Sequence, residues 1–159
     1  MSRWPLTIAA LILSVSGVHA IERGWLPTFV LASLDGGSTN DGIARAGTRV
    51  VIYVPSDCVN CDGILKSLGS PELRALSSKI VVVVGFGDPQ PVLESRTRHP
   101  QLQQAAWFAD STGAVGQWLG PGSTITLLGI RDGIVEWSVG GVLTDARDLT
   151  TIITSWIQQ

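Results

Sequence analysis

The sequence predicts an α/β domain with a mixed central β-sheet and helices on both faces of that sheet. Two apolar, β-branched runs, RVVIYV over 49–54 and KIVVVVGF over 79–86, have the length and composition of buried strands. Apolar residues at helical spacing over 58–68 lie between them, and a strand–helix–strand unit predicts a parallel pair. A hairpin pattern over 124–139 adds antiparallel strands.

Local signals predict the remaining elements in chain order. Residues 27–34 alternate loosely and end in the turn Asp35-Gly36-Gly37, which indicates a strand. Ser70 is expected to cap a short helix that starts at Pro71. Residues 90–108 are expected to hold one or two helices. Thr144 is expected to cap a final helix to about Trp156, whose apolar face comprises Leu149, Ile152, Ile153 and Trp156.

The composition bounds the function. A chain of 159 residues supports one domain with a substantial core. Its formal net charge is −2, and no run of Lys or Arg occurs. Neither a nucleic acid nor an anionic membrane surface is therefore expected as a partner.

The first twenty residues form a separate segment. Arg3 is its only charged residue, residues 4–18 are almost entirely apolar, and Val18-His19-Ala20 resembles a signal-peptidase site. We therefore expect a signal peptide over 1–20, a mature domain over 21–159 and a periplasmic or secreted protein. The alternative is a retained membrane anchor, although the apolar run is short for a span of about 20 residues.

Cys58 and Cys61 are the two cysteines of the chain, in the motif Cys-Val-Asn-Cys. The motif follows a predicted strand and is expected to open a helix at Cys58, whose N-terminal partial charge would stabilise a thiolate. Cys58 is then the nucleophile, and Cys61 attacks the mixed disulfide. A structural disulfide and half of a metal site are the alternatives, and neither explains a strand–turn–helix setting. The mature chain has a single His, His99, so several His and Cys ligands for a zinc site cannot come from one chain. A Ser-His-Asp triad would have to use His99, and the sequence gives it little support.

Three stretches resemble the secreted thioredoxin-like family, which includes the cytochrome-c-maturation and methylamine-utilisation thioredoxins. They are PTFVLASLDGG through CVNCDGILKSL (27–68), ADSTGAVGQWLG (109–120) and LLGIRDGIVEWSVGG (127–141). The resemblance implies a thioredoxin fold and a thiol–disulfide oxidoreductase that exchanges disulfides with protein substrates. It also implies that Cys58 and Cys61 are the catalytic residues, that no bound cofactor is needed, and that a membrane-bound reductant supplies electrons if the protein acts as a reductant.

The chain departs from this family beside the cysteines. Thr124, preceded by Ser123, stands where the family has a cis-Pro that presents its backbone to substrate. We therefore take Ser123 and Thr124 as candidate substrate-binding residues. Asp57 replaces the bulky residue that usually precedes the first Cys, and it should oppose formation of the Cys58 thiolate.

The acidic residues near the motif also depart from the family. Ile52 and Ile64 occupy the two positions where an acid is expected near the second Cys, while Asp57 and Asp62 flank the motif. We interpret these two aspartates as helix-capping and first-turn charges.

Two other functions are alternatives to the oxidoreductase. A peroxiredoxin needs Thr three residues before its reactive Cys, and here that residue is Pro55. A non-enzymatic thioredoxin-like module that binds a partner or a metal is the second hypothesis. A functional interpretation places Trp118, between Gly116 and Gly120, on the rim of a substrate site. We favour the alternative, in which Trp118 packs against the rest of the protein.

Overall fold

A computed structural model describes residues 21, 23–34, 38–40, 42–58, 60–85, 88–120, 124–141 and 146–159. The predicted signal peptide, Ser123 and the predicted cap Thr144 lie outside these residues. No helix within the described ranges is long and apolar enough to cross a membrane.

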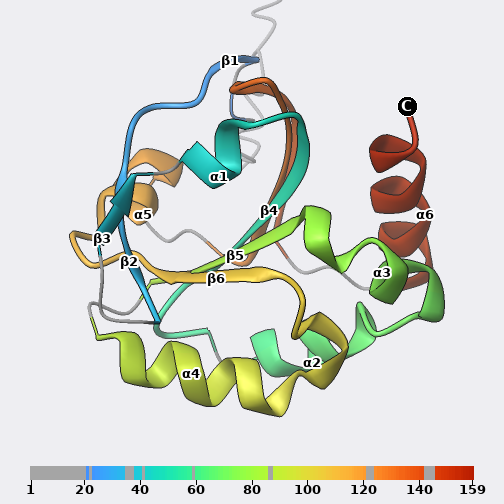
Figure 1. Cartoon of the computed structure of the whole chain (residues 1–159), viewed down its shortest axis with the longest axis horizontal. Helices are drawn as coiled ribbons and strands as arrows, with labels where there is room; N and C mark the ends of the chain where they lie inside the picture. Colours follow the sequence, from blue (N-terminus) through green and yellow to red (C-terminus); the bar gives the residue numbers. More distant parts are fainter. Residues whose placement is uncertain are drawn as a thin grey trace, which may run out of the picture.

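The described strands form one eight-stranded mixed sheet (Figure 1) in the order β1-β8-β7-β4-β5-β6-β2-β3. The pairs β4–β5 and β5–β6 are parallel, and every other pair is antiparallel. The predicted mixed sheet is thus confirmed. The strands are β1 (Gly24–Trp25), β2 (Val30–Ser33), β3 (Ser38–Asn40), β4 (Thr48–Val54), β5 (Ile80–Val84), β6 (Ala106–Ala109), β7 (Thr126–Arg131) and β8 (Ile134–Gly140).

Helices cover both faces of the sheet, as predicted (Figure 1). Residues of α2, α3, α4 and α6 belong to one core cluster, and residues of α1 and α5 belong to the other. The α-helices are α1 (Gly42–Arg45), α2 (Cys61–Ser67), α3 (Pro71–Ala75), α4 (Pro89–Arg98), α5 (Ala114–Leu119) and α6 (Ala146–Ile157), with short 3-10 helices η1 (Ser77–Lys79) and η2 (Pro100–Leu102).

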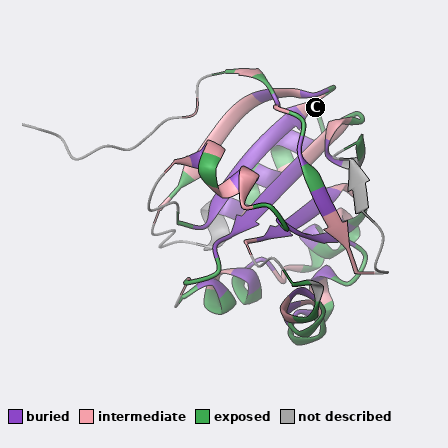
Figure 2. Cartoon of the chain, turned by 90° about the vertical axis from the view of Figure 1, so that its left-hand side faces the viewer, coloured by how far each residue is buried: buried purple, intermediate pink, exposed green. Residues whose placement is uncertain are grey.

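The central strand β4 contributes to both cores. Val50, Ile52 and Val54 pack on the α2 side, while Val51 and Tyr53 pack on the α5 side. Successive side chains of a strand point to opposite faces, so a strand covered on both sides has a continuous apolar run. Figure 2 shows the resulting buried band through the middle of the molecule.

The predicted hairpin is confirmed with slightly different limits. Strands β7 and β8 pair from Arg131↔Ile134 to Thr126↔Gly140, and Asp132-Gly133 forms the two-residue turn between them. Both turn residues have positive φ, 49° and 81°, which a tight hairpin of this type requires and which Asp and Gly tolerate.

The segment 90–108 differs from the prediction. Helix α4 and the short η2 are present, but Ala106–Ala109 forms strand β6, which pairs with both β5 and β2. A four-residue Ala-Trp-Phe-Ala run has no helical or strand periodicity of its own. Its conformation is set by the edge of β5, to which it adds in parallel register.

The final helix also differs at one position. Leu149, Ile153 and Trp156 are buried as predicted, but Ile152 is 42% exposed. Adjacent residues of a helix point about 100° apart, so when Ile153 faces the core, Ile152 lies at the edge of the buried face of the helix.

The predicted cap of α3 is confirmed, because the Ser70 Oγ accepts a hydrogen bond of 3.2 Å from the Leu73 N–H. Ser70→Ala is expected to lower the free energy of unfolding by about 1 kcal/mol, since it leaves this N–H without its partner. Urea denaturation measures the loss. Ser67→Ala is the matched control: Ser67 Oγ donates to the Ile64 carbonyl inside the chain's own helix, and Ala is the better helix former, so no loss is expected. Equal losses in the two variants would contradict the capping assignment.

Candidate functional site

Cys58 and Cys61 form a disulfide just beyond the C-terminal end of β4, with their Cα atoms 5.5 Å apart. The two residues differ in access. Cys58 is half-buried, whereas Cys61 is only 3% exposed and belongs to the core beneath α2. An incoming sulfur can therefore reach Cys58 more readily than Cys61.

Helix α2 begins at Cys61, so the expectation that Cys58 opens it is wrong. The Cys58 N–H instead donates to the Pro55 carbonyl (3.3 Å), which closes a turn after β4. Asn60 is the N-cap residue, without a side-chain capping bond, and its carbonyl accepts from Ile64 N–H. Asp57 therefore does not cap this helix, and Cys58 lies in the turn before it.

Asp62 lies in the first turn of α2, as expected, but its carboxylate binds another element. Oδ2 accepts from Arg98 (3.1 Å) and Oδ1 is 3.1 Å from His99 Nε2, both at the C-terminal end of α4. His99 is 3% exposed. The sequence offered no signal for this pair, because 37 residues separate its members.

A groove of about 350 Å³ runs between α2 and α4 beside the disulfide, and the two helices lie side by side in Figure 1. Apolar residues at the ends of β4 and β5 contribute to its lining, and both cysteines line it. Charged side chains from the two helices complete it. The lining residues are Val54, Pro55, Ser56, Cys58, Cys61, Asp62, Leu65, Val84, Pro91, Glu94, Ser95 and Arg98.

Thr124 is not part of this groove. Its side chain is exposed just before β7, and its carbonyl accepts a 2.9 Å hydrogen bond from Thr126 Oγ1. The structure therefore does not join Thr124 to the groove residues.

Tyr53, which sequence reasoning missed, packs against a glycine that lies next to the loop carrying Cys58. Its hydroxyl lies against Gly85 and Gly116, where an added Cβ would overlap it. The same Cβ on Gly85 would lie 3.2 Å from the Ser56 nitrogen, so the loop after β4 packs onto this glycine. Burial raises the pKa of the Tyr53 hydroxyl, and the carboxylates of Asp110 and Asp57 raise it further. The hydroxyl therefore stays protonated at neutral pH.

Trp118 packs against Phe29, with ring centroids 5.7 Å apart, and joins the core on the α5 side of the sheet. The favoured packing interpretation of this residue is thus confirmed.

No protein-family model and no curated protein matches the sequence. Solved structures do match it. The chain resembles dsbF of Mycobacterium tuberculosis (19% identity, TM-score 0.63, 82% of this chain and 98% of that one). It also resembles reduced Prx3 of Vibrio vulnificus (14% identity, TM-score 0.66, 84% of this chain and 99% of that one). A third similar structure is the exposed lipoprotein thioredoxin Etrx1 of Streptococcus pneumoniae (14% identity, TM-score 0.58, 81% of this chain and 99% of that one). At these identities the similarity concerns the arrangement of the chain in space. The protein therefore has the thioredoxin fold, with its Cys-x-x-Cys pair directly after the central strand.

Proposed function

We propose that the protein is an exported thiol–disulfide oxidoreductase that exchanges disulfides with protein substrates through Cys58 and Cys61. The observation that carries the proposal is the unequal burial of the two sulfur-bearing residues on a thioredoxin fold. Cys58 is reachable, and Cys61 lies behind it. A purely structural disulfide has no need of a reachable member and closes too small a loop to stabilise the fold appreciably.

The reaction balances in two steps. The Cys58 thiolate attacks one sulfur of a substrate disulfide, and the other substrate sulfur leaves as a thiolate that takes up a proton. Cys61, after losing its proton, attacks the Cys58 sulfur and releases the second substrate thiol. The pair is oxidised by two electrons and the substrate disulfide is reduced; the reverse sequence donates a disulfide.

Export and partners belong to the same proposal. The segment 1–20 resembles a signal peptide, and one of the similar solved structures is that of a secreted M. tuberculosis disulfide oxidoreductase. A reductant in an oxidising compartment needs a supply of electrons, for which a membrane-bound partner is proposed. Ser123 and Thr124, which precede β7 in the sequence, are proposed to contact the substrate backbone. No bound cofactor is needed for either step.

Equilibration of the protein with glutathione and dithiothreitol buffers tests the proposal. The Cys58–Cys61 pair is expected to cycle freely; a potential near about −270 mV would assign it as a reductant, and one near about −120 mV as a disulfide donor. A pair that does not cycle would refute the oxidoreductase and favour a binding or assembly module.

A further inference from the structure

We infer that His99 is a positioning residue that holds the Asp62 carboxylate beside the cysteine pair and thereby makes that pair more reducing. The inference rests on the proposed function, and it assigns a role to two residues that the exchange steps do not use. The buried imidazole of His99, at the end of α4, is bound to Asp62, the residue directly after Cys61.

The hydrogen bonds around His99 define which ring nitrogen carries the proton. Gln101 Nε2, an amide nitrogen that can only donate, lies 3.4 Å from His99 Nδ1 and donates to the Leu65 carbonyl at 3.0 Å. Nδ1 is therefore the acceptor, which places the ring hydrogen on Nε2. This nitrogen then donates to Asp62 Oδ1.

These contacts immobilise a carboxylate that would otherwise rotate in solvent. The Asp62 side chain is 54% exposed, but its two oxygens are bound separately, one by His99 and one by Arg98. Gln101, in η2 directly after α4, donates to the Leu65 carbonyl of α2. The position of the carboxylate relative to α2 is thus set by a buried group rather than by its own rotamer preference.

The electrostatic consequence concerns the reduced state of the pair. Asp62 lines the same groove as Cys58 and Cys61. A negative charge there destabilises a thiolate and leaves the uncharged disulfide unaffected, so it shifts the equilibrium toward the disulfide. The other charged residues of the groove lining are Glu94, which adds to this effect, and Arg98, which opposes it. Asp57, in the loop before Cys58, adds to it as well.

The opposite signs of Asp62 and Arg98 make the inference testable by the reduction potential of the full mature protein. Asp62→Asn is expected to favour the dithiol about threefold, a rise of ~15 mV for a two-electron couple. Arg98→Gln is expected to lower the potential. His99 still holds the Asp62 carboxylate in this variant, but the positive charge that partly compensated it is gone. Glu72→Gln removes an exposed carboxylate from α3, outside the groove, and serves as the matched control with no shift.

The role of His99 itself is tested by a double-mutant cycle. His99→Phe keeps an aromatic ring at this position and removes the donor, so it should raise the potential by no more than Asp62→Asn does. In the Asp62→Asn background it should add nothing. The pKa of the Cys58 thiol, followed by thiolate absorbance, should fall in both single variants. If His99→Phe does not fold, His99→Ala takes its place in the cycle.

Three results would overturn the inference: equal-signed shifts in Asp62→Asn and Arg98→Gln, no shift in Asp62→Asn, or a His99 effect that persists in full without Asp62. Each of these results leaves the proposed oxidoreductase function unaffected, because the Cys58–Cys61 pair still cycles. Failure of the unmodified protein to cycle would instead refute the proposed function.

Discussion

A Cys61→Ser variant is expected to accumulate a covalent complex with its protein substrates, whereas Cys58→Ser is expected to lose disulfide exchange entirely. The reachable Cys58 makes the first attack, so its removal leaves no accessible nucleophile. Cys61, only 3% exposed, is suited to attack the neighbouring Cys58 sulfur and not an incoming chain. Without it the mixed disulfide has no internal partner to release it.

Reduction of insulin by dithiothreitol measures the first effect, and non-reducing electrophoresis of the variants mixed with a disulfide-bearing protein measures the second. Cys58→Ser should fall to the background rate, and only Cys61→Ser should give a band that a reducing agent removes. The double variant is the control for association without a covalent bond. Retained activity in Cys58→Ser, or trapping by it, would reverse the assigned roles.

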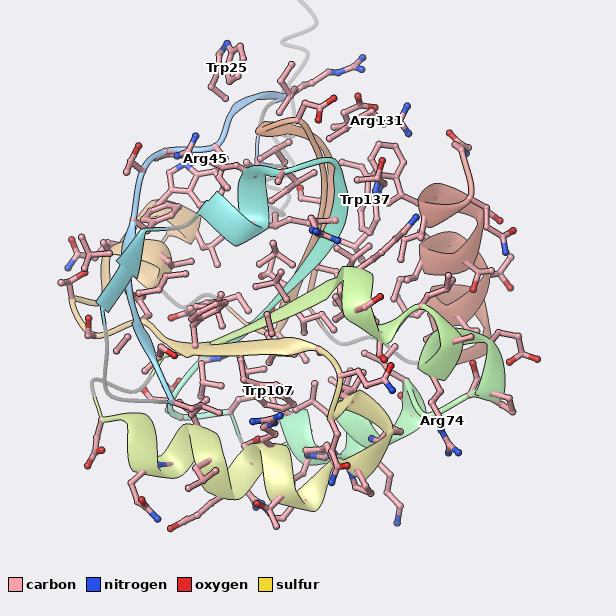
Figure 3. The ribbon with its side chains drawn as sticks, viewed as in Figure 1. Trp25, Arg45, Arg74, Trp107, Arg131 and Trp137 are labelled. Atoms are coloured by element: carbon pink, nitrogen blue, oxygen red, sulfur yellow. A yellow bond between two sulfur atoms is a disulfide. The ribbon has the colours of Figure 1, made fainter. Side chains whose placement is uncertain are left out.

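The second large effect is on stability and concerns Gly129 in β7. Gly129 pairs with Trp137 of β8, and a Cβ on Gly129 would overlap the Trp137 indole. Trp137 in turn meets Trp156 of α6 edge to face, with ring centroids 6.0 Å apart, and the Arg131 guanidinium lies 4.5 Å from the centre of the Trp156 ring. Figure 3 shows Arg131 and Trp137 beside the α6 helix. The glycine thus makes room for the rings that join α6 to the sheet.

Gly129→Ala is expected to lower the free energy of unfolding by about 2–3 kcal/mol, because the indole is displaced and its packing against α6 is lost. Urea denaturation followed by tryptophan fluorescence measures the change. Gly63→Ala is the matched control: it lies inside α2 with nothing within 4 Å of an added Cβ, so a gain of up to about 1 kcal/mol is expected. A Gly129→Ala variant as stable as the wild type would show that the indole relocates without loss.

The central strands and the hairpin could be predicted because their signals are local. The apolar run of β4 and the Asp132-Gly133 turn each contain the cause of their own conformation, in burial on two faces and in positive φ. Strand β6 has no such signal, because its partners β5 and β2 are remote in the chain. The start of α2 was misplaced for a related reason: the turn from Cys58 N–H to Pro55 competes with the helix, and residue type alone does not decide between them.

For the candidate site, the sequence determined that two cysteines follow the central strand, and from that alone a redox pair could be predicted. Tertiary structure alone decided where the groove lies, and that Asp62 is bound by Arg98 of α4 and by His99, the C-cap residue of that helix. The physical reason is distance along the chain. Periodicity and spacing report contacts within one element, whereas a buried imidazole meeting a carboxylate 37 residues away depends on how two helices pack across the end of a sheet.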